Sequence, residues 1–296
     1  MIAPLPGLSS VADRYDAVLC DVWGVVHNGV AAHADACEAL SRFQAARGPV
    51  VLISNAPRPG AAVIEQFEAL GVPGAAWAAI VTSGDATRED LRARGAGPAW
   101  AIGPVRDVAL FEGLPLKFVE SADEAAFVAC TGLFDDETET PEDYRDRLAR
   151  VAERRLPFVC ANPDRVVQRG GELIWCGGAL ADLYAELLGF PDVEAAGELV
   201  VMLGKPYAPI YALAMAEAER LAGRALDRSR VLCIGDGLAT DVRGANRQGL
   251  DCLFVGSGIH GGDTLDADGR LDAERTRALL ESQGAHAACA MAELAW

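Results

Sequence analysis

The chain has 296 residues, of which 51% are hydrophobic, and this predicts about two domains with well-filled cores. Its formal net charge of −17 argues against a nucleic-acid partner, because binding a phosphate backbone requires clustered Lys and Arg side chains. No apolar run approaches the ~20 residues that span a bilayer, so we expect no membrane segment.

The N-terminal residues lack the basic region and the long apolar region of a signal peptide. The eight cysteines are scattered, several of them inside apolar runs, and they form no CxxC pair. This distribution is typical of packed, reduced thiols, and it does not resemble a disulfide framework or a zinc site. We therefore expect a cytoplasmic protein.

The first 83 residues alternate between strand and helix patterns. A buried strand over 17–20 ends at Asp21 and is followed by Gly24 and an Asn28-Gly29 turn. A helix over 34–46, a second buried strand over 49–54, a helix over 61–70 and a third strand over 78–82 follow in that order. The β-α-β-α-β order predicts a parallel sheet with crossover helices.

Residues 84–189 are less regular and predict an inserted domain. Helices are expected over 85–94, with Ser83 or Asp85 as the cap, and over 141–154 and 179–188. Strands are expected over 100–103, 125–131 and 158–161. The predicted organisation is therefore a core domain, residues 1–83 plus 190–296, interrupted by a second α/β domain, residues 84–189.

The last third returns to strong patterns. We expect strands over 200–205, 231–236 and 252–255, and helices over 209–221, 237–247 and 274–281. The glycine-rich loop 256–262, which contains His260, is interpreted as a surface loop that could reach the rim of a site.

Four predicted strand ends carry polar groups, and parallel strands bring their carboxyl ends to one edge of a sheet. The groups are Asp21, Ser54-Asn55, Lys205, and Asp236 with Asp241. Each residue also has an ordinary structural use, as a cap, a turn former or a solvated charge. Together, however, carboxylates that hold Mg²⁺, a lysine that offsets phosphate charge and a carboxylate that attacks phosphorus predict phosphoryl transfer.

These segments resemble the four motifs of the haloacid dehalogenase (HAD) superfamily, in the same order along the chain. The matching segments are Asp21-Val-Trp-Gly-Val, Ser54-Asn55, Gly204-Lys205-Pro206 and Gly235-Asp236-Gly-Leu-Ala-Thr240-Asp241. The insert resembles the larger α/β cap (class C2) of class IIA members, which include p-nitrophenylphosphatase-like and sugar-phosphatase-like enzymes. Within it, Cys160-Ala-Asn-Pro-Asp164 and Gly177-Gly-Ala-Leu180 are similar to cap motifs of that class. The resemblance implies a Rossmann-like parallel-sheet α/β core with an inserted α/β cap domain.

The resemblance also implies roles for these residues. Asp21 would be the nucleophile and a metal ligand, and the backbone carbonyl of Trp23 would be a second ligand. Ser54 and Asn55 would bind the phosphoryl group, and Lys205 would offset its charge. Asp236 would bind Mg²⁺, and Asp241 would support the metal directly or through water.

The cap and the partners are expectations of the same kind. Asn162 and Asp164 are candidates to face a small phosphorylated metabolite, although Asn-Pro-Asp is equally consistent with a plain turn. Dimerisation through the cap is expected by analogy, so the chain is also a candidate homodimer.

Trp23 is the departure from the family pattern. Phosphatases of the family place an aspartate here, which protonates the leaving group and later activates water. Indole can do neither. The enzyme is therefore expected to be slow, or to prefer substrates with good leaving groups such as acyl or aryl phosphates. A third alternative is that another residue replaces the aspartate. His27 is the nearest titratable candidate, and the other interpretation of His27 is a histidine that only stabilises the turn. The remaining alternative is a non-catalytic, phosphometabolite-binding regulatory protein. Dehalogenation is discounted, because HAD dehalogenases need no metal whereas Asp236 and Asp241 preserve a metal site.

Overall fold

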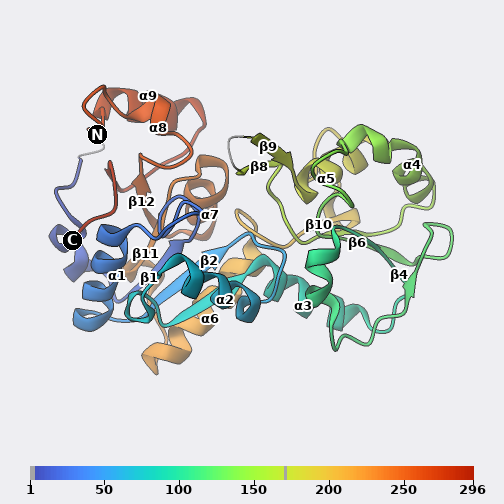
Figure 1. Cartoon of the computed structure of the whole chain (residues 1–296), viewed down its shortest axis with the longest axis horizontal. Coiled ribbons are helices and arrows are strands. Elements are labelled where there is room, and N and C mark those ends of the chain that lie inside the picture. Colours follow the sequence, from blue (N-terminus) through green and yellow to red (C-terminus); the bar gives the residue numbers. More distant parts are fainter. Residues whose placement is uncertain (1–3, 170–171) are drawn as a thin grey trace. The chain divides into compact units, whose positions relative to one another are not determined.

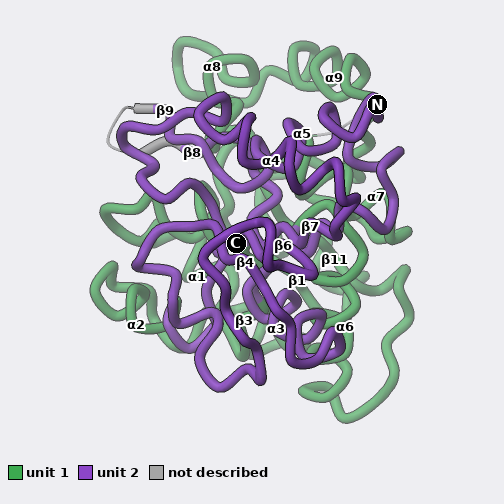
Figure 2. The backbone as a smooth tube through the Cα atoms, turned by 90° about the vertical axis from the view of Figure 1, so that its right-hand side faces the viewer, with its two compact units in different colours: residues 1–54, 63–81, 205–296 green, residues 55–62, 82–204 purple. Residues whose placement is uncertain are grey.

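The computed structural model describes residues 4–169 and 172–296, and contacts within it define two compact units (Figure 2). The first unit comprises residues 1–54, 63–81 and 205–296, and the second comprises residues 55–62 and 82–204. Each unit is built on its own largely parallel sheet with helices. The predicted fold class, a Rossmann-like parallel-sheet core with an inserted α/β part, is confirmed.

The first unit contains a six-stranded sheet in the order β13-β12-β11-β1-β2-β3. The pairs β13–β12, β12–β11, β11–β1 and β1–β2 are all parallel, and Figure 1 shows β11, β1 and β2 together. The strands are β1 (Ala17–Asp21), β2 (Val50–Ser54), β3 (Ala79–Thr82), β11 (Val231–Gly235), β12 (Asp251–Val255) and β13 (Cys289–Met291). The sequence pattern did not indicate β13, because three residues are too few to show a period.

The second unit contains a five-stranded sheet in the order β10-β7-β6-β4-β5, in which all four pairings are parallel. An antiparallel two-stranded ribbon, β8–β9, stands apart from that sheet. The strands are β4 (Ala99–Ile102), β5 (Phe118–Val119), β6 (Phe127–Cys130), β7 (Phe158–Cys160), β8 (Val166–Arg169), β9 (Glu172–Trp175) and β10 (Val200–Met202).

Most helices follow the predicted ranges closely, whereas the short helix Gly261–Thr264 begins inside the segment that the sequence predicts as a loop. They are α1 (Ala34–Ala46), α2 (Gly60–Leu70), α3 (Ser83–Arg94), α4 (Arg145–Glu153), α5 (Gly177–Leu187), α6 (Ala208–Ala222), α7 (Arg243–Gln248), α8 (Gly261–Thr264) and α9 (Ala273–Ser282). In α1 the predicted inward face is buried, as shown by Ala36, Ala39, Leu40 and Phe43. Both α1 and α6 pack against β2, so they cover a strand that lies next to β1 in the sheet.

Helix α3 differs from the prediction at its start. The cap is Thr82, not Ser83 or Asp85: the Thr82 side chain accepts the backbone N–H of Asp85, and the Asp85 side chain accepts the N–H of Thr82. This reciprocal capping box places Asp85 at the third helical position, where its carboxylate satisfies an otherwise unpaired donor.

The predicted domain boundaries lie between residues 83 and 84 and between 189 and 190, whereas the contact-based units change at 81/82 and 204/205. The difference at the second boundary comes from β10, which pairs with β7 in register Val200 with Phe158. The assignment of 84–189 as an independent domain stays a prediction.

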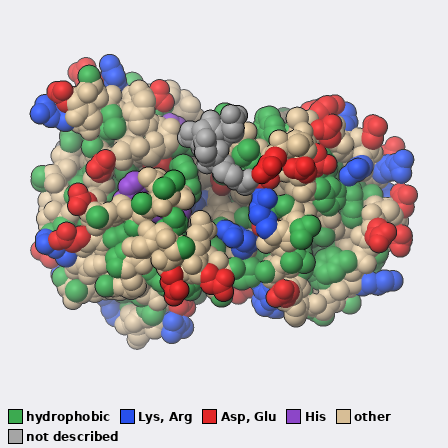
Figure 3. Space-filling view, in the orientation of Figure 1, with side chains coloured by type: hydrophobic (Ala, Val, Ile, Leu, Met, Phe, Trp, Pro, Cys, Tyr) green, Lys and Arg blue, Asp and Glu red, His purple; other side chains and the backbone are tan. Residues whose placement is uncertain are grey.

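The cysteines, the apolar character of the helices and the surface charges were also predicted from the sequence. All eight cysteines are buried and free. None of the helices in the described ranges, 4–169 and 172–296, combines the length and the apolar character needed to cross a membrane. On the face shown in Figure 3, Lys and Arg side chains are mixed with Asp and Glu.

Candidate active site

Three buried carboxylates converge in the first unit. Asp21 is the last residue of β1, Asp236 directly follows β11, and Asp241 lies in a π-helical turn, Leu238–Val242. The pairing of Cys20 with Ile234 brings the ends of β1 and β11 together. Carboxylate oxygens from all three residues lie within 4.8 Å of one another. The sequence expectation that these acids meet at one edge of the sheet is therefore confirmed.

Lys205 bridges two of the three acids. Its Nζ donates to Oδ1 of Asp21 at 2.5 Å and to Oδ1 of Asp241 at 2.7 Å, and the side chain is 3% exposed. The expectation that Lys205 ends a strand of the same sheet was wrong, because β10 pairs with β7 in the other sheet. Its ammonium group reaches the carboxylates through the length of its side chain, from the loop before α6.

The electrostatics of this carboxylate cluster favour a cation. Burial raises the pKa of Asp21 to about 6, with the Asp236 charge adding to the effect and Lys205 opposing it. Burial and the charge of a neighbouring acid likewise raise the pKa of Asp236 and of Asp241 to about 6. Burial alone would lower the pKa of Lys205, but Asp21 and Asp241 hold it above its ordinary value. Three acids around one ammonium leave negative charge uncompensated, and oxygen donors so arranged suit a hard cation such as Mg²⁺.

Backbone amides orient each carboxylate. The N–H of Val22 donates to Oδ1 of Asp21 at 2.7 Å, and the N–H of Gly237 donates to Oδ2 of Asp241 at 3.0 Å. The N–H of Ile259 donates to Oδ2 of Asp236 at 2.7 Å. These contacts fix the direction of the oxygens, which a metal site requires.

Two loops press against Asp236 so closely that only glycine fits. A Cβ on Gly24, whose φ is +86°, would lie 2.4 Å from Oδ2 of Asp236, and a Cβ on Gly258 would lie 1.9 Å from it. The sequence predicts only that the loop 256–262 could reach the rim of a site, and this prediction does not single out Gly258 and Ile259. The signal that could have identified them is a glycine pair, Gly256 and Gly258, directly after β12.

Replacing Gly258 with alanine should therefore damage the carboxylate cluster without changing the fold. The new methyl group displaces Asp236, and we expect Mg²⁺ affinity to fall by about 10- to 100-fold, as for other changes next to a ligand. Titration of Mg²⁺ by calorimetry measures this. Gly262→Ala is the matched control, because a Cβ there meets nothing within 4 Å. Equal Mg²⁺ affinity in both variants would contradict a metal site at the Asp236 carboxylate.

Trp23 lies on the loop that follows Asp21 and is 42% exposed. A Cβ on Gly29 would lie 3.4 Å from its Nε1, so the nitrogen edge of the indole lies beside the turn at Gly29. The role of the Trp23 backbone carbonyl as a metal ligand stays a prediction.

His27 is a buried residue of the same loop. It is 3% exposed, its Nδ1 accepts the N–H of Gly29 at 3.0 Å, and its ring packs edge-on against Phe67 at 5.9 Å between ring centroids. Burial, with a smaller contribution from His33, lowers its pKa to about 4. These contacts are those of a structural turn histidine.

The pKa of His27 predicts a specific loss of stability in mild acid. Because the ordinary pKa is 6.5 and the folded value is about 4, the unfolded chain binds this proton more readily. The contribution of neutral His27 is complete above pH 6.5 and is lost progressively as the pH falls through about 4. Denaturant titrations between these values should show that wild type loses more unfolding free energy than His27→Gln does. Parallel pH profiles of the two proteins would contradict this.

Among the predicted phosphate-binding and cap residues, Ser54 lies in the first unit, and Asn55, Asn162 and Asp164 lie in the second. Ser54 ends β2, whose Ile53 pairs with Asp21, so it lies at the same edge of the sheet as that carboxylate. Asn55 is grouped with the second unit, where its Nδ2 donates to Oδ1 of Asp164 at 2.9 Å. Asn162 also takes part, because its Oδ1 accepts the N–H of Asp164 at 3.1 Å. The Asn162 side chain thus forms a local turn with Asp164, and Asp164 in turn orients Asn55. That Asn162 and Asp164 face a substrate stays a prediction.

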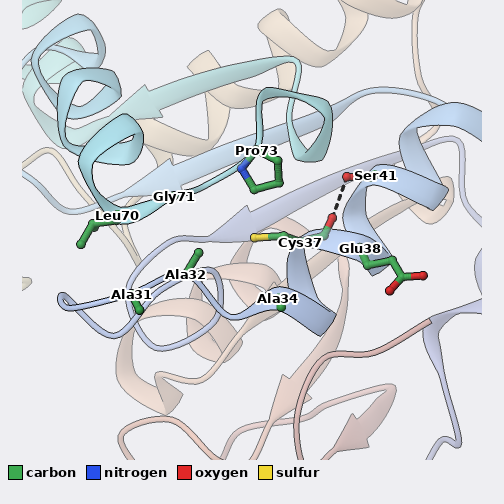
Figure 4. Close-up of a pocket in the computed structure, with 9 residues that line it drawn as sticks. All are labelled: Ala31, Ala32, Ala34, Cys37, Glu38, Ser41, Leu70, Gly71 and Pro73. Carbon is green, nitrogen blue, oxygen red and sulfur yellow. Dashed lines mark hydrogen bonds between the residues drawn. The ribbon is translucent and has the colours of Figure 1, made fainter.

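A surface pocket elsewhere in the first unit does not compete with this site. Figure 4 shows that it lies between the start of α1 and the end of α2, with Cys37, Ser41 and Leu70 on its walls. The Ser41 hydroxyl donates to the carbonyl of Cys37 at 2.7 Å, and none of the three clustered carboxylates lines the pocket. Its polar side chains are Cys37, Glu38 and Ser41.

Comparisons with protein-family models and with solved structures both give matches. Residues 18–117 match the family model of haloacid dehalogenase-like hydrolases, and residues 202–282 match a second HAD-hydrolase-like model. The structure of a hydrolase of the haloacid dehalogenase-like family from Brucella suis 1330 is 44% identical, covers 98% of this chain and 100% of that one, and superposes with a TM-score of 0.82.

More distant structures share the fold. A possible sugar phosphatase of the HAD superfamily from Cytophaga hutchinsonii is 17% identical, with 99% and 98% of the two chains covered and a TM-score of 0.76. A glycerol phosphate phosphatase from Mycobacterium tuberculosis in complex with magnesium is 23% identical, with 87% and 73% covered and a TM-score of 0.63. The comparison with curated protein sequences gives no match.

Proposed function

The chain belongs to the haloacid dehalogenase-like family, and we propose that it is a Mg²⁺-dependent phosphatase-type hydrolase. Its substrate would be a small phosphorylated metabolite, and Asp21 would carry the phosphoryl group between two half-reactions. The proposal rests on the buried cluster of Asp21, Asp236 and Asp241, in which Lys205 donates to both Asp21 and Asp241.

Asp21 is the proposed nucleophile. An Oδ atom attacks phosphorus, the bond from phosphorus to the ester oxygen breaks, and that oxygen leaves with the electron pair. Water then attacks the phosphorus of the aspartyl-phosphate, the bond to the Asp21 oxygen breaks, and inorganic phosphate leaves. Lys205 lowers the repulsion between the anionic carboxylate and the anionic phosphate, because its ammonium already contacts Oδ1 of Asp21.

The metal would be held by Asp21, Asp236, Asp241 and the backbone carbonyl of Trp23. When bound, Mg²⁺ supplies positive charge that stabilises the phosphate oxygens in the transition state. Ser54 and Asn55 would bind those oxygens as hydrogen-bond donors. The second unit would act as a cap, with Asn162 and Asp164 setting the position of Asn55.

Low or atypical activity is part of the proposal. Trp23 stands where an acid/base group would assist both half-reactions, and an indole N–H does not titrate usefully. Loss of a general acid/base typically costs about 10²–10⁴-fold in rate. We also propose, by analogy, a cytoplasmic location and dimerisation through the cap.

Phosphate release from a panel of phosphate monoesters, with and without Mg²⁺, tests the proposal. We expect slow release that requires Mg²⁺ and is abolished in Asp21→Asn. Absence of release from every ester, with Asp21→Asn behaving like wild type, would refute it.

The presence of Trp23 also favours a second candidate, a regulatory protein that binds a phosphometabolite without turning it over. In that case Mg²⁺ and inorganic phosphate would raise the melting temperature of wild type, as ligands of the folded state do, while no ester is hydrolysed.

A further inference from the structure

The loop that begins at Asn55 is rich in proline and takes hydrogen-bond donors from another segment. Residues 55–60 are Asn-Ala-Pro-Arg-Pro-Gly, and its two prolines have no N–H. The carbonyls of Ala56 and Arg58, which precede these prolines, accept hydrogen bonds from the first turn of α3. The loop and α3 belong to the same compact unit.

The first turn of α3 offers both side-chain and backbone donors to the loop. The Ser83 hydroxyl and the Gly84 N–H both donate to the carbonyl of Ala56, at 2.9 and 3.2 Å. The Thr82 hydroxyl donates to the carbonyl of Arg58 at 2.7 Å. An N–H in the first turn of a helix has no acceptor within that helix. The loop therefore supplies an acceptor that the helix lacks, and the helix supplies donors to the loop.

The contact between loop and helix is also close. A Cβ on Gly84 would collide with backbone atoms of Arg58, so the backbones approach each other directly. At the end of the loop, the N–H of Gly60 donates to Oδ1 of Asp85 at 3.2 Å. The loop is thus held by α3 along most of its length.

The Ser83 hydroxyl serves the loop and not its own helix terminus. Helix α3 is capped by Thr82, whose side chain accepts the N–H of Asp85, so α3 does not need the Ser83 hydroxyl as a cap. Ser83 is fully buried, and its hydroxyl donates to the carbonyl of Ala56, the residue that directly follows Asn55.

The side chain of Asn55 is fixed as well. Its Nδ2 donates to Oδ1 of Asp164 at 2.9 Å, and a Cβ on Gly204 would lie 2.4 Å from its Oδ1. Asn55 is therefore held at its amide group by Asp164 and Gly204, and at its following peptide group by Ser83.

We propose that Ser83 is a positioning residue for Asn55 and strengthens phosphate binding through the Ala56 carbonyl. This inference rests on the proposed function, in which Asn55 donates to the phosphate oxygens, and it adds a residue that acts on phosphate only through Asn55. A donor that is already held in place loses little conformational freedom when the ligand binds, so the ligand binds more tightly.

A double-mutant cycle on the whole chain tests this role. The probe is inorganic phosphate with Mg²⁺, and the readout is its Kd from calorimetry. Ser83→Ala should raise Kd by about two- to tenfold, the fold-change that corresponds to one neutral hydrogen bond. In the Asn55→Ala background the same substitution should leave Kd nearly unchanged, because the residue through which Ser83 acts is gone.

Thr87→Val is the matched control. Thr87 is also buried in α3, but its hydroxyl donates within the helix, to the carbonyl of Ser83 at 2.7 Å. Its loss should leave the Kd for phosphate at the wild-type value. Melting temperatures with Mg²⁺ and without phosphate report the stability of each variant separately from its affinity.

The outcomes separate this inference from the proposed function. An unchanged Kd in Ser83→Ala, the same rise in both backgrounds, or an equal rise in Thr87→Val would overturn the positioning role and leave the proposed hydrolase intact. If wild type binds no phosphate with Mg²⁺, the proposed phosphate site itself is refuted, and the role of Ser83 with it.

Discussion

Trp23→Asp is expected to raise kcat/KM for an alkyl phosphate such as cyclohexyl phosphate by about 10²–10⁴-fold. That is the usual contribution of a positioned general acid/base, and the rest of the carboxylate cluster is already assembled. Because Trp23 is 42% exposed, its removal should cost little stability. Steady-state kinetics with Mg²⁺, together with a melting curve, measure both quantities.

Trp23→Asn is the matched control for this gain. Asparagine has nearly the shape of aspartate but no titrating group, so it should leave kcat/KM for the alkyl ester near the wild-type level. If the asparagine variant gains as much as the aspartate variant, the barrier lies in the bulk of the indole and not in the missing acid. If neither variant gains, Trp23 is not what limits the rate.

Lys205→Met is expected to lower the free energy of unfolding by about 3–5 kcal/mol, measured without added metal ion. The substitution leaves buried carboxylates without the ammonium that bridges Asp21 and Asp241, and breaking one side of a buried ion pair typically costs this much. Urea denaturation gives the value directly.

Two further variants show whether the loss comes from unpaired charge. Lys117→Met removes an exposed lysine and should be nearly neutral. The double variant Lys205→Met with Asp241→Asn should recover part of the lost free energy of unfolding, because it removes one of the carboxylates that no longer has an ammonium partner. Equal destabilisation by Lys117→Met and Lys205→Met, or a strictly additive double variant, would contradict the role of Lys205.

Much of the fold could be predicted because its signals are local. The apolar face of 34–46 and the glycine-flanked strands that end at Asp21 and Asp236 reproduce α1, β1 and β11 almost to the residue. The meeting of Asp21 with Asp236 also followed from the sequence, since parallel strands present their carboxyl ends at one edge.

What could not be predicted depends on contacts between distant segments. Nothing local shows that β10 pairs with β7, so the path by which Lys205 reaches Asp21 was misjudged. Ile259 contacts Asp236, which lies 23 residues earlier in the chain. The sequence also does not show which atoms lie next to the Gly258 backbone and exclude a side chain there. The contact between Asn55 and Asp164, likewise, joins residues separated by 109 positions.

Whether Asp21 forms an aspartyl-phosphate can be tested by measuring the mass of the protein after an acid quench during turnover of phenyl phosphate with Mg²⁺. Because the second half-reaction also lacks an acid/base group, we expect wild type to accumulate one added phosphoryl group per chain, located on Asp21 by peptide mapping. Asp21→Asn should show none, and Trp23→Asp should show less, since its aspartate speeds the release of phosphate. Phosphate release from wild type with no phosphorylated chain at any time, together with full activity of Asp21→Asn, would contradict Asp21 as the nucleophile.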